Sequence, residues 1–197
     1  MRDACLALGV RIVEGTPART IRRDGDRVVV ETDGGHVAAT HAALATSAFP
    51  SLLERVGAFA VPVRHCALMT RPLSDAELAS VGRSERFGLG DVGNQFHCAR
   101  PSADNRILWG GYDAVYHRGG RIRPEHAHRP ETFERLAHPF QQTFPQLTEV
   151  DFTHAWGGVI DTCSRVFPIF GTALGGRAAY GAGYTGLGSA RPGSGPR

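Results

Sequence analysis

Three glycine-bearing blocks near the end of the chain decide how it is interpreted: AWGG at residues 155–158, PIFG at 168–171 and YGAGYTGLG at 180–188. Apolar residues separate the blocks, and the last one follows a strand-like run at 178–180. Residues 181–186 satisfy the GxGxxG expression of dinucleotide-binding loops. Such a loop also needs a complete βαβ unit and an acidic residue about 20 positions later, whereas only residues 187–197 follow. We therefore do not interpret this block as a Rossmann phosphate loop.

A glycine turn that follows a strand can have a binding role or a purely structural one. It can present backbone N–H groups and the positive end of a helix to a negatively charged ligand. It can also simply close a strand, because glycine adopts the positive φ that tight turns require. The turn alone does not distinguish the two roles.

The composition is that of a folded globular chain. Of its 197 residues 42% are hydrophobic and 21% are charged, which suffices for a core in one or two domains. The net charge of +3 is spread along the sequence, so we expect neither nucleic-acid nor membrane-surface binding. No apolar run approaches the roughly 20 residues that span a bilayer. The opening MRDACL lacks the apolar region of a signal peptide, so we expect a cytoplasmic location.

The four cysteines and nine histidines do not indicate a metal centre. The cysteines are far apart and form no CxxC pair. The histidines are scattered, apart from an H-x-H pair at 126–128 in a segment rich in Arg and Pro. We expect neither a metal site nor a disulfide framework.

The first 50 residues predict a small sheet. Residues 4–8 indicate the end of a helix that stops at Gly9, and residues 10–13 indicate a short strand. Three further strand-like runs lie at 18–22, 27–31 and 36–40. The DG and DGG turns between them predict a three-stranded antiparallel meander. The small apolar run at 42–46 is typical of a strand buried on both faces of a parallel sheet.

Residues 51–150 predict a second unit with a sheet and covering helices. Strand-like runs lie at 61–69, 96–99 and 106–109. A short helix is expected at 52–56, and the capping-box spacing of Ser74 and Glu77 predicts another from Asp75 to near Gly82. Apolar residues at helical spacing over 133–144 predict two short helices, because Pro139 interrupts the pattern.

In their order and spacing the glycine blocks closely resemble the C-terminal flavin-contacting segment of the D-amino-acid oxidase/glycine oxidase family of FAD-dependent oxidoreductases. Four further segments are similar to the same family: LGVRIVEGTP at 8–17, ATSA at 45–48, TRPL at 70–73 with RILWGG at 106–111, and FPQL at 144–147. The resemblance covers residues 4–188. WGGVID at 156–161 and RVFP at 165–168 look most like the gamma-glutamylputrescine oxidoreductase-type amine oxidases.

This resemblance implies an α/β (α+β) fold, in which a partial FAD-binding domain with a β-meander is interrupted by a mixed-sheet substrate domain. The implied boundaries are 1–50 for the first part of the FAD-binding domain, 51–150 for the substrate-binding domain, 151–190 for the return to the FAD-binding domain and 191–197 for a tail. The family continues there as a helix, whereas prolines and glycines crowd residues 192–196. The family's N-terminal dinucleotide-binding motif has no counterpart in this sequence.

The implied cofactor is FAD. The matching segments imply that it is contacted by Ala18, Ala45, Thr46, Ser47, Trp156, Gly157, Gly158, Pro168, Gly171, Gly183, Tyr184, Thr185, Gly186, Leu187 and Gly188.

The implied reaction oxidises the C–N bond of an amine or amino acid by hydride transfer to the flavin, followed by imine hydrolysis and by flavin reoxidation with oxygen or another acceptor. On the substrate side, the candidates are residues at the ends of predicted strands: His97, Arg100, Tyr112, Asp113 and Tyr116. Arg100 suits a carboxylate and Asp113 a distal ammonium. Each of the five is alternatively an ordinary surface or turn residue.

The chain departs from the family at two places. Related sarcosine oxidases have a His and a Lys around the final glycine turn, where this chain has Leu187 and Ala190, so efficient sarcosine-type oxidase chemistry is not expected. Cys163 lies in the region where some relatives attach flavin covalently, but outside the matching motif. The alternative function is an inactive truncated fragment, or half of a split flavoprotein whose partner chain supplies the FAD pyrophosphate loop.

Overall fold

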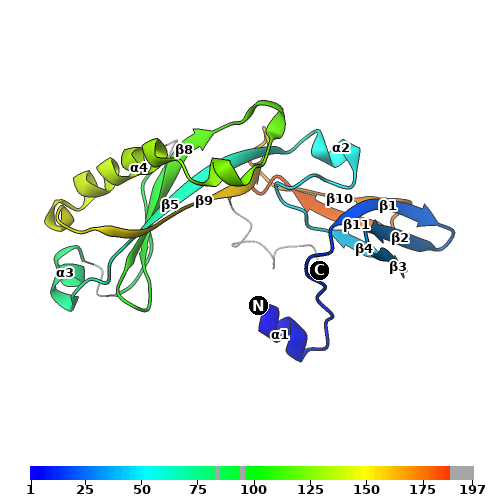
Figure 1. Cartoon of the computed structure of the whole chain (residues 1–197), viewed down its shortest axis with the longest axis horizontal. Coiled ribbons are helices and arrows are strands. Elements are labelled where there is room, and N and C mark those ends of the chain that lie inside the picture. The colour runs from blue at the N-terminus through cyan, green and yellow to red at the C-terminus, as the bar shows by residue number, and fades with distance from the viewer. Residues whose placement is uncertain (83–84, 94–95, 187–197) are drawn as a thin grey trace.

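The strands of the computed structural model, which describes residues 1–82, 85–93 and 96–186, form three sheets (Figure 1). The largest has the order β6-β7-β8-β5-β9, and the two smaller ones have the orders β1-β2-β3 and β10-β11-β4. The long strands β5 (Val61–Thr70) and β9 (Phe152–Thr162) run from the large sheet toward the small ones. The α/β fold class predicted from the sequence is confirmed.

The predicted antiparallel meander is confirmed. It consists of β1 (Ala18–Asp24), β2 (Arg27–Thr32) and β3 (Gly35–Ala39), and the two turns fall at the DG and DGG sequences. Val28 and Val29 of the central strand are its buried residues. Local turn chemistry therefore sufficed to predict this sheet.

The five-stranded sheet is antiparallel in every described pairing, whereas a mixed sheet was expected. Its shorter strands are β6 (Leu89–Gly90), β7 (His97–Pro101) and β8 (Ile107–Val115). Helix α4 (Pro130–Thr143) covers one face, and the helical turn η3 (Pro145–Leu147) follows it. Trp109 is the centre of this core: its ring meets Phe140 edge-on at 5.6 Å, and its Nε1 donates to the Leu136 carbonyl over 2.9 Å.

The prediction that Pro139 splits the last helical pattern was wrong, because α4 is one helix with Pro139 inside it. A proline costs a helix interior about 3 kcal/mol. Phe133, Leu136 and Phe140 are buried on both sides of it, and each such burial contributes roughly 1.5–3 kcal/mol. The sum exceeds the cost of the proline, so packing against the sheet keeps the helix continuous.

The third sheet differs from the expectation in two respects. Strand β4 (Ala42–Leu44) pairs in parallel with β11 (Ala178–Ala182), and β11 pairs with β10 (Ile169–Ala173). A strand buried on both faces was expected at 42–46, but β4 is short, lies at the sheet edge and buries only Leu44. The strand predicted at 10–13 was also wrong, because this apolar segment is exposed and has no neighbouring strand among the described residues.

Helix α1 (Arg2–Ala7) stands apart from the sheets and has no buried residue (Figure 1). Short helical elements connect the rest: α2 (Glu54–Gly57), α3 (Asp75–Ser80), η1 (Arg118–Gly120) and η2 (Pro124–Ala127). In the described part of the chain, no helix has the length and apolar character needed to cross a membrane.

The predicted capping box of α3 is confirmed and extended by an ion pair. The Glu77 N–H donates to Ser74 Oγ over 3.2 Å, and the Ser74 N–H donates to Glu77 Oε2 over 2.8 Å. Arg71 Nη2 donates to Glu77 Oε1 over 2.8 Å. The Arg71 hydrogen bonds, followed by the Ser74 N–H, lower the pKa of Glu77 from 4.5 to about 2.

We predict that α3 loses stability as the pH falls from 4.5 toward 2. A carboxylate whose pKa is lower in the folded state stabilises that state above its unfolded pKa, and the contribution disappears as the folded pKa is approached. Glu77→Gln keeps the capping geometry but not the charge. Hydrogen exchange of the α3 amides should therefore depend less on pH in E77Q than in the wild type. An equal pH dependence in both would contradict this role of Glu77.

Candidate functional site

The first part of the site is the face of β9 that points away from α4. Alternate residues of a strand share a face, so Trp156, Gly158 and Ile160 project to the same side. The Trp156 side chain is 43% exposed. Among the described residues, no heavy atom would lie within 4 Å of a Cβ added at Gly158, so the backbone of this exposed residue can be approached closely.

The second part is the glycine turn at residues 183–186, which Asp161 fixes to the end of β9. Asp161 Oδ2 accepts from the Gly183 N–H over 2.6 Å, and the Asp161 carbonyl accepts from the Thr185 N–H over 2.8 Å. Asp161 is only 3% exposed. Buried polar groups need such partners, so the two hydrogen bonds hold the turn against the end of β9.

The turn and the strand together form an open surface, here called the β9 cradle, made of Trp156, Gly158, Ile160 and Gly186. Gly186 has φ +81, and among the described residues the nearest atom to a Cβ added there would be Ile160 Cδ1 at 3.9 Å. Side chains at Gly158 and Gly186 would fill this space. Open backbone of this kind suits a flat ligand that lies against it, so the cradle fits a flavin ring.

The other predicted cofactor residues around these strands lie against neighbouring side chains or on the other face of β9. A Cβ at Gly183, which has φ +72, would lie 2.8 Å from Cys163 Sγ. The Tyr180 side chain takes the space beside Gly171, and Pro168 is buried. Gly157 alternates with the cradle residues and projects to the other face of β9, and the Tyr184 ring meets Phe170 edge-on at 5.8 Å.

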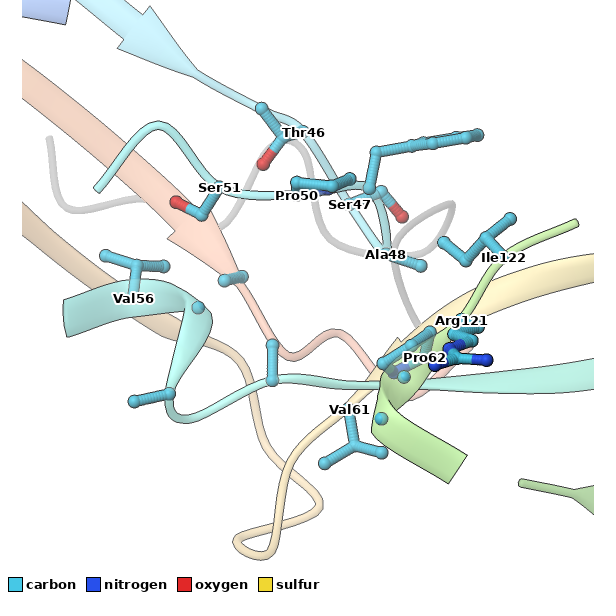
Figure 2. A pocket seen from close by; sticks show the side chains of 17 residues that line it. Thr46, Ser47, Ala48, Pro50, Ser51, Val56, Val61, Pro62, Arg121 and Ile122 are labelled. Atoms are coloured by element: carbon cyan, nitrogen blue, oxygen red, sulfur yellow. The ribbon is translucent and has the colours of Figure 1, made fainter. Parts of the chain in front are cut away.

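The predicted ATSA turn lies beside a pocket of about 600 Å³ (Figure 2). Thr46, Ser47 and Ala48 form one wall, and Pro62 with Arg121 lies opposite (Figure 2). Ala182, which directly precedes the glycine turn, also lines the pocket. The fold thus brings two of the predicted cofactor segments together. The size is in the range of small-molecule sites.

Other predicted cofactor residues lie elsewhere. Ala18, at the start of β1, and Ala45, just after β4, are exposed and are not among the residues lining that pocket. Thr185 donates through Oγ1 to the Gly183 carbonyl over 3.2 Å. Leu187 and Gly188 lie outside the residues that the structure describes.

The structure does not bring the predicted substrate residues together. The His97 ring stacks on Trp109 at 5.1 Å, toward α4, and its Nδ1 lies 3.0 Å from Asp91 Oδ2. Arg100 lies three residues further along β7 and therefore on the opposite face. There it lines a separate pocket with Met69 and Leu108. His97 therefore faces the α4 side of the sheet, and Arg100 faces the pocket on the opposite side.

The other three substrate candidates lie along β8 or beyond its end. Tyr112 and Asp113 are in β8, but their side chains are not among those that the structure describes. Tyr116 follows the strand and is 63% exposed.

Sequence reasoning missed two residues of this region. Asp161 was part of a quoted motif, and an acidic residue at the end of an apolar strand was an available signal for a buried, hydrogen-bonded carboxylate. His65 pairs across the sheet with Gly158, and burial lowers its pKa, so the imidazole beside the cradle is neutral at pH 7. Nothing in the sequence around His65 indicated this position.

Comparisons with known proteins identify the family of this chain. The family described as FAD dependent oxidoreductase (DAO) matches residues 1–193. The chain is 32% identical over 189 residues to "Probable oxidoreductase OrdL" of Rhizobium meliloti, covering 91% of this chain and 41% of the relative. It is 24% identical over 172 residues to "Sarcosine oxidase subunit beta" of Rhodobacter capsulatus, covering 84% and 38%. The chain thus spans about two fifths of the length of the curated relatives it matches.

Solved structures share the fold. Glycine oxidase from Geobacillus kaustophilus superposes with a TM-score of 0.71 at 20% identity, covering 93% of this chain and 47% of that one. L-proline dehydrogenase from P. horikoshii gives 0.73 at 16% identity, covering 93% and 48%. With the match over residues 1–193, the chain belongs to the DAO family of FAD-dependent oxidoreductases.

Proposed function

We propose that this chain supplies the flavin-facing cradle and the substrate sheet of an FAD-dependent oxidoreductase that acts on an amine or amino acid. The observation that carries the proposal is the β9 cradle: open backbone at Gly158 and Gly186, beside the exposed Trp156 ring. Residues 1–50 and 151–190 would belong to the FAD-binding domain and residues 51–150 to the substrate-binding domain. The relatives' names, which include a sarcosine oxidase and a glycine oxidase, support the class of substrate.

The hydrogen bonds of the turn determine which backbone groups can meet the cofactor. Asp161 accepts hydrogen bonds from the N–H groups of Gly183 and Thr185. The N–H groups of Tyr184 and Gly186 have no acceptor among the described residues. We infer that these two donors face the flavin, where they would favour the negative charge of its reduced form. When bound, FAD supplies the hydride acceptor and passes the electrons to oxygen or another acceptor.

The neutral His65 imidazole lies where it could accept a proton from a substrate amine at the β9 cradle. It lies on β5 opposite Gly158, so it is next to the cradle. An amine must be uncharged to release a hydride, and a neutral imidazole can accept its proton. We propose this role for His65.

A second chain segment completes the proposed FAD site. The described residues contain one parallel strand pair, β4 with β11, and β4 has no described partner on its outer side. We propose that a dinucleotide-binding βαβ unit pairs with this edge and holds the pyrophosphate at a helix N-terminus. The alternative function, an inactive fragment or half of a split flavoprotein, is supported by the same unpaired edge of β4. In that alternative, the dinucleotide-binding unit comes from a separate chain or is missing altogether.

We predict that the 197-residue chain alone binds FAD weakly, and that a complex with a GxGxxG-bearing N-terminal half holds FAD stoichiometrically. The reason is that most of the pyrophosphate contacts would come from the added half. Flavin absorbance after purification measures both. Tightly held FAD in the chain alone would contradict the need for a second unit, and a well-formed complex without FAD would contradict the flavin role.

Two glycine variants of the turn should have different effects. Both Gly183→Ala and Gly186→Ala force an alanine into positive φ, which costs on the order of 1 kcal/mol. Only G183A also brings a methyl group against Cys163, so it should lose more stability. G186A adds its methyl to the cradle and should weaken flavin binding more than it weakens the fold. Urea denaturation and flavin titration of the complex measure the two effects. An unchanged flavin affinity in G186A would contradict the assignment of the cradle.

Asp161 should act as a positioning residue for the turn. Asp161→Ala leaves the buried Gly183 N–H without an acceptor, which costs about 1–3 kcal/mol of stability. Asp161→Asn retains an acceptor oxygen and should cost less. Flavin affinity should follow the same order, with wild type tightest, then D161N, then D161A. Equal flavin affinity in all three would show that the turn does not need this anchor.

A further inference from the structure

Two histidines outside the candidate site are stacked on each other. His117 directly precedes η1 and His126 lies in η2. The ring centroids are 3.5 Å apart, and the two ring planes differ by 8°. Arg64 of β5 lies beside them, and its Nη2 donates to the Arg123 carbonyl over 3.4 Å. We call the two rings the imidazole stack.

The imidazole stack has buried nitrogens without hydrogen-bond partners. Among the described residues, no partner is present for the buried atoms His117 Nε2, His126 Nδ1 and Arg64 Nε. Arg64 as a whole is only 5% exposed. A protonated imidazole carries an N–H at both ring nitrogens, so protonation adds a buried donor that has no acceptor. The stacked arrangement therefore suits neutral rings.

Nearby positive charges also favour neutral rings. Burial lowers the pKa of His117 from its ordinary 6.5, and the charges of His126, Arg64 and Arg129 lower it further. A histidine whose pKa is lower in the stacked state stabilises that state above pH 6.5, and this contribution is lost as the pH falls below 6.5. Two charged rings at this distance also repel each other. Acidification therefore favours separation of the rings.

The nearby carboxylates do not offset this repulsion. Glu125 of η2 faces His126, but its side chain is largely exposed and is paired with Arg123 over 3.5 Å. On β9, which also contacts η2, the Asp161 carboxylate accepts from the Gly183 N–H. In the described part of the chain, neither carboxylate forms an ion pair with the imidazole stack.

The segment between the two histidines forms part of the pocket beside the ATSA turn, here called the ATSA pocket. Residues 119–122 line it, and Figure 2 shows Arg121 and Ile122 next to Pro62. A Cβ added at Gly120 would lie 3.3 Å from Pro62 Cγ, so η1 lies against β5 at this point. Gly119 and Gly120 have φ +73 and +65, which allows the backbone to turn sharply there. Because the histidines flank this wall of the pocket, separation of their rings frees the wall to move.

We propose that the imidazole stack is an acid-sensitive latch, which holds residues 118–125 over β5 while both rings are neutral and releases them when the rings become charged. The wall of the ATSA pocket moves when the latch opens, so the shape of this pocket depends on pH. The latch is independent of the proposed flavin role, because it depends only on the two rings and on Arg64.

NMR measurements on the 197-residue chain test the latch. Between about pH 7.5 and 5, the exchange protection of the Gly120 and His126 amides, whose hydrogen bonds lie at the two ends of the segment, should fall at least about 5-fold. The methyl signals of Ala48 and Ala182 in the ATSA pocket should shift with the same midpoint as the His117 ring, below pH 6.5. A His117 midpoint at or above pH 6.5, or unchanged protection of both amides, would overturn the proposal.

Matched variants distinguish the latch from general effects of acid. His126→Phe keeps a ring for stacking but removes its charge, so the acid-induced loss of protection at Gly120 should shrink to less than about 2-fold. His126→Gln removes the ring as well, so protection should be low and independent of pH. His128→Phe is the control, because the His128 ring meets Phe133 instead, at 5.3 Å, and its pH response should equal that of the wild type.

Three results of this comparison would overturn the latch. The first is a wild-type pH response in both H126F and H126Q, and the second is a loss of that response in H128F. The third is an equal loss of protection in the amides paired between β5 and β9, because this would show unfolding of the whole chain instead of release of one segment.

Discussion

The buried Asp161 carboxylate is the interaction on which the rest of the site depends. Its side chain and its backbone carbonyl accept hydrogen bonds from two N–H groups of the glycine turn. These bonds connect the end of β11 to the end of β9. Since β9 belongs to the large sheet and β11 to a small one, this contact joins the two. It also determines which N–H groups of the turn are engaged and which are available. A buried charge of this kind is stable only when hydrogen-bonded, which makes the geometry of the turn specific.

Local signals predicted the parts of the fold that depend on local chemistry. The DG and DGG turns predicted the meander, and the Ser74 and Glu77 spacing predicted the start of α3. Long-range packing decided the features that were predicted wrongly. Phe140 and its neighbours hold α4 together across Pro139, and the segment at 10–13 has no described strand beside it. For α4 the deciding partners are distant in sequence, and for residues 10–13 no partner strand is described, so in neither case could a local window of residues give the answer.

The candidate site shows the same division. The glycine blocks and the ATSA turn were identified from sequence, and the structure places Ala182, next to the glycine turn, on the same pocket as ATSA. The need for glycine at position 183 could not be predicted from the sequence. The side chain that fills the space beside Gly183 is Cys163, which follows the end of β9 and is distant in sequence. His97 and Arg100 were grouped as substrate residues, yet the two-residue period of a strand puts them on opposite faces. That alternation follows from the strand alone, and the pairing of β7 with β8 adds which face each residue is on, because it places Arg100 opposite Leu108.

We propose that the N–H groups of Tyr184 and Gly186 meet the flavin, while Asp161 accepts hydrogen bonds from those of Gly183 and Thr185. Residue-resolved amide exchange on the complex, with and without FAD, measures this directly. We expect the Gly183 and Thr185 amides to exchange slowly in both states, whereas those of Tyr184 and Gly186 should exchange fast without FAD and slow down when it binds. Exchange at Tyr184 and Gly186 that does not change when FAD binds would show that these N–H groups do not contact the flavin.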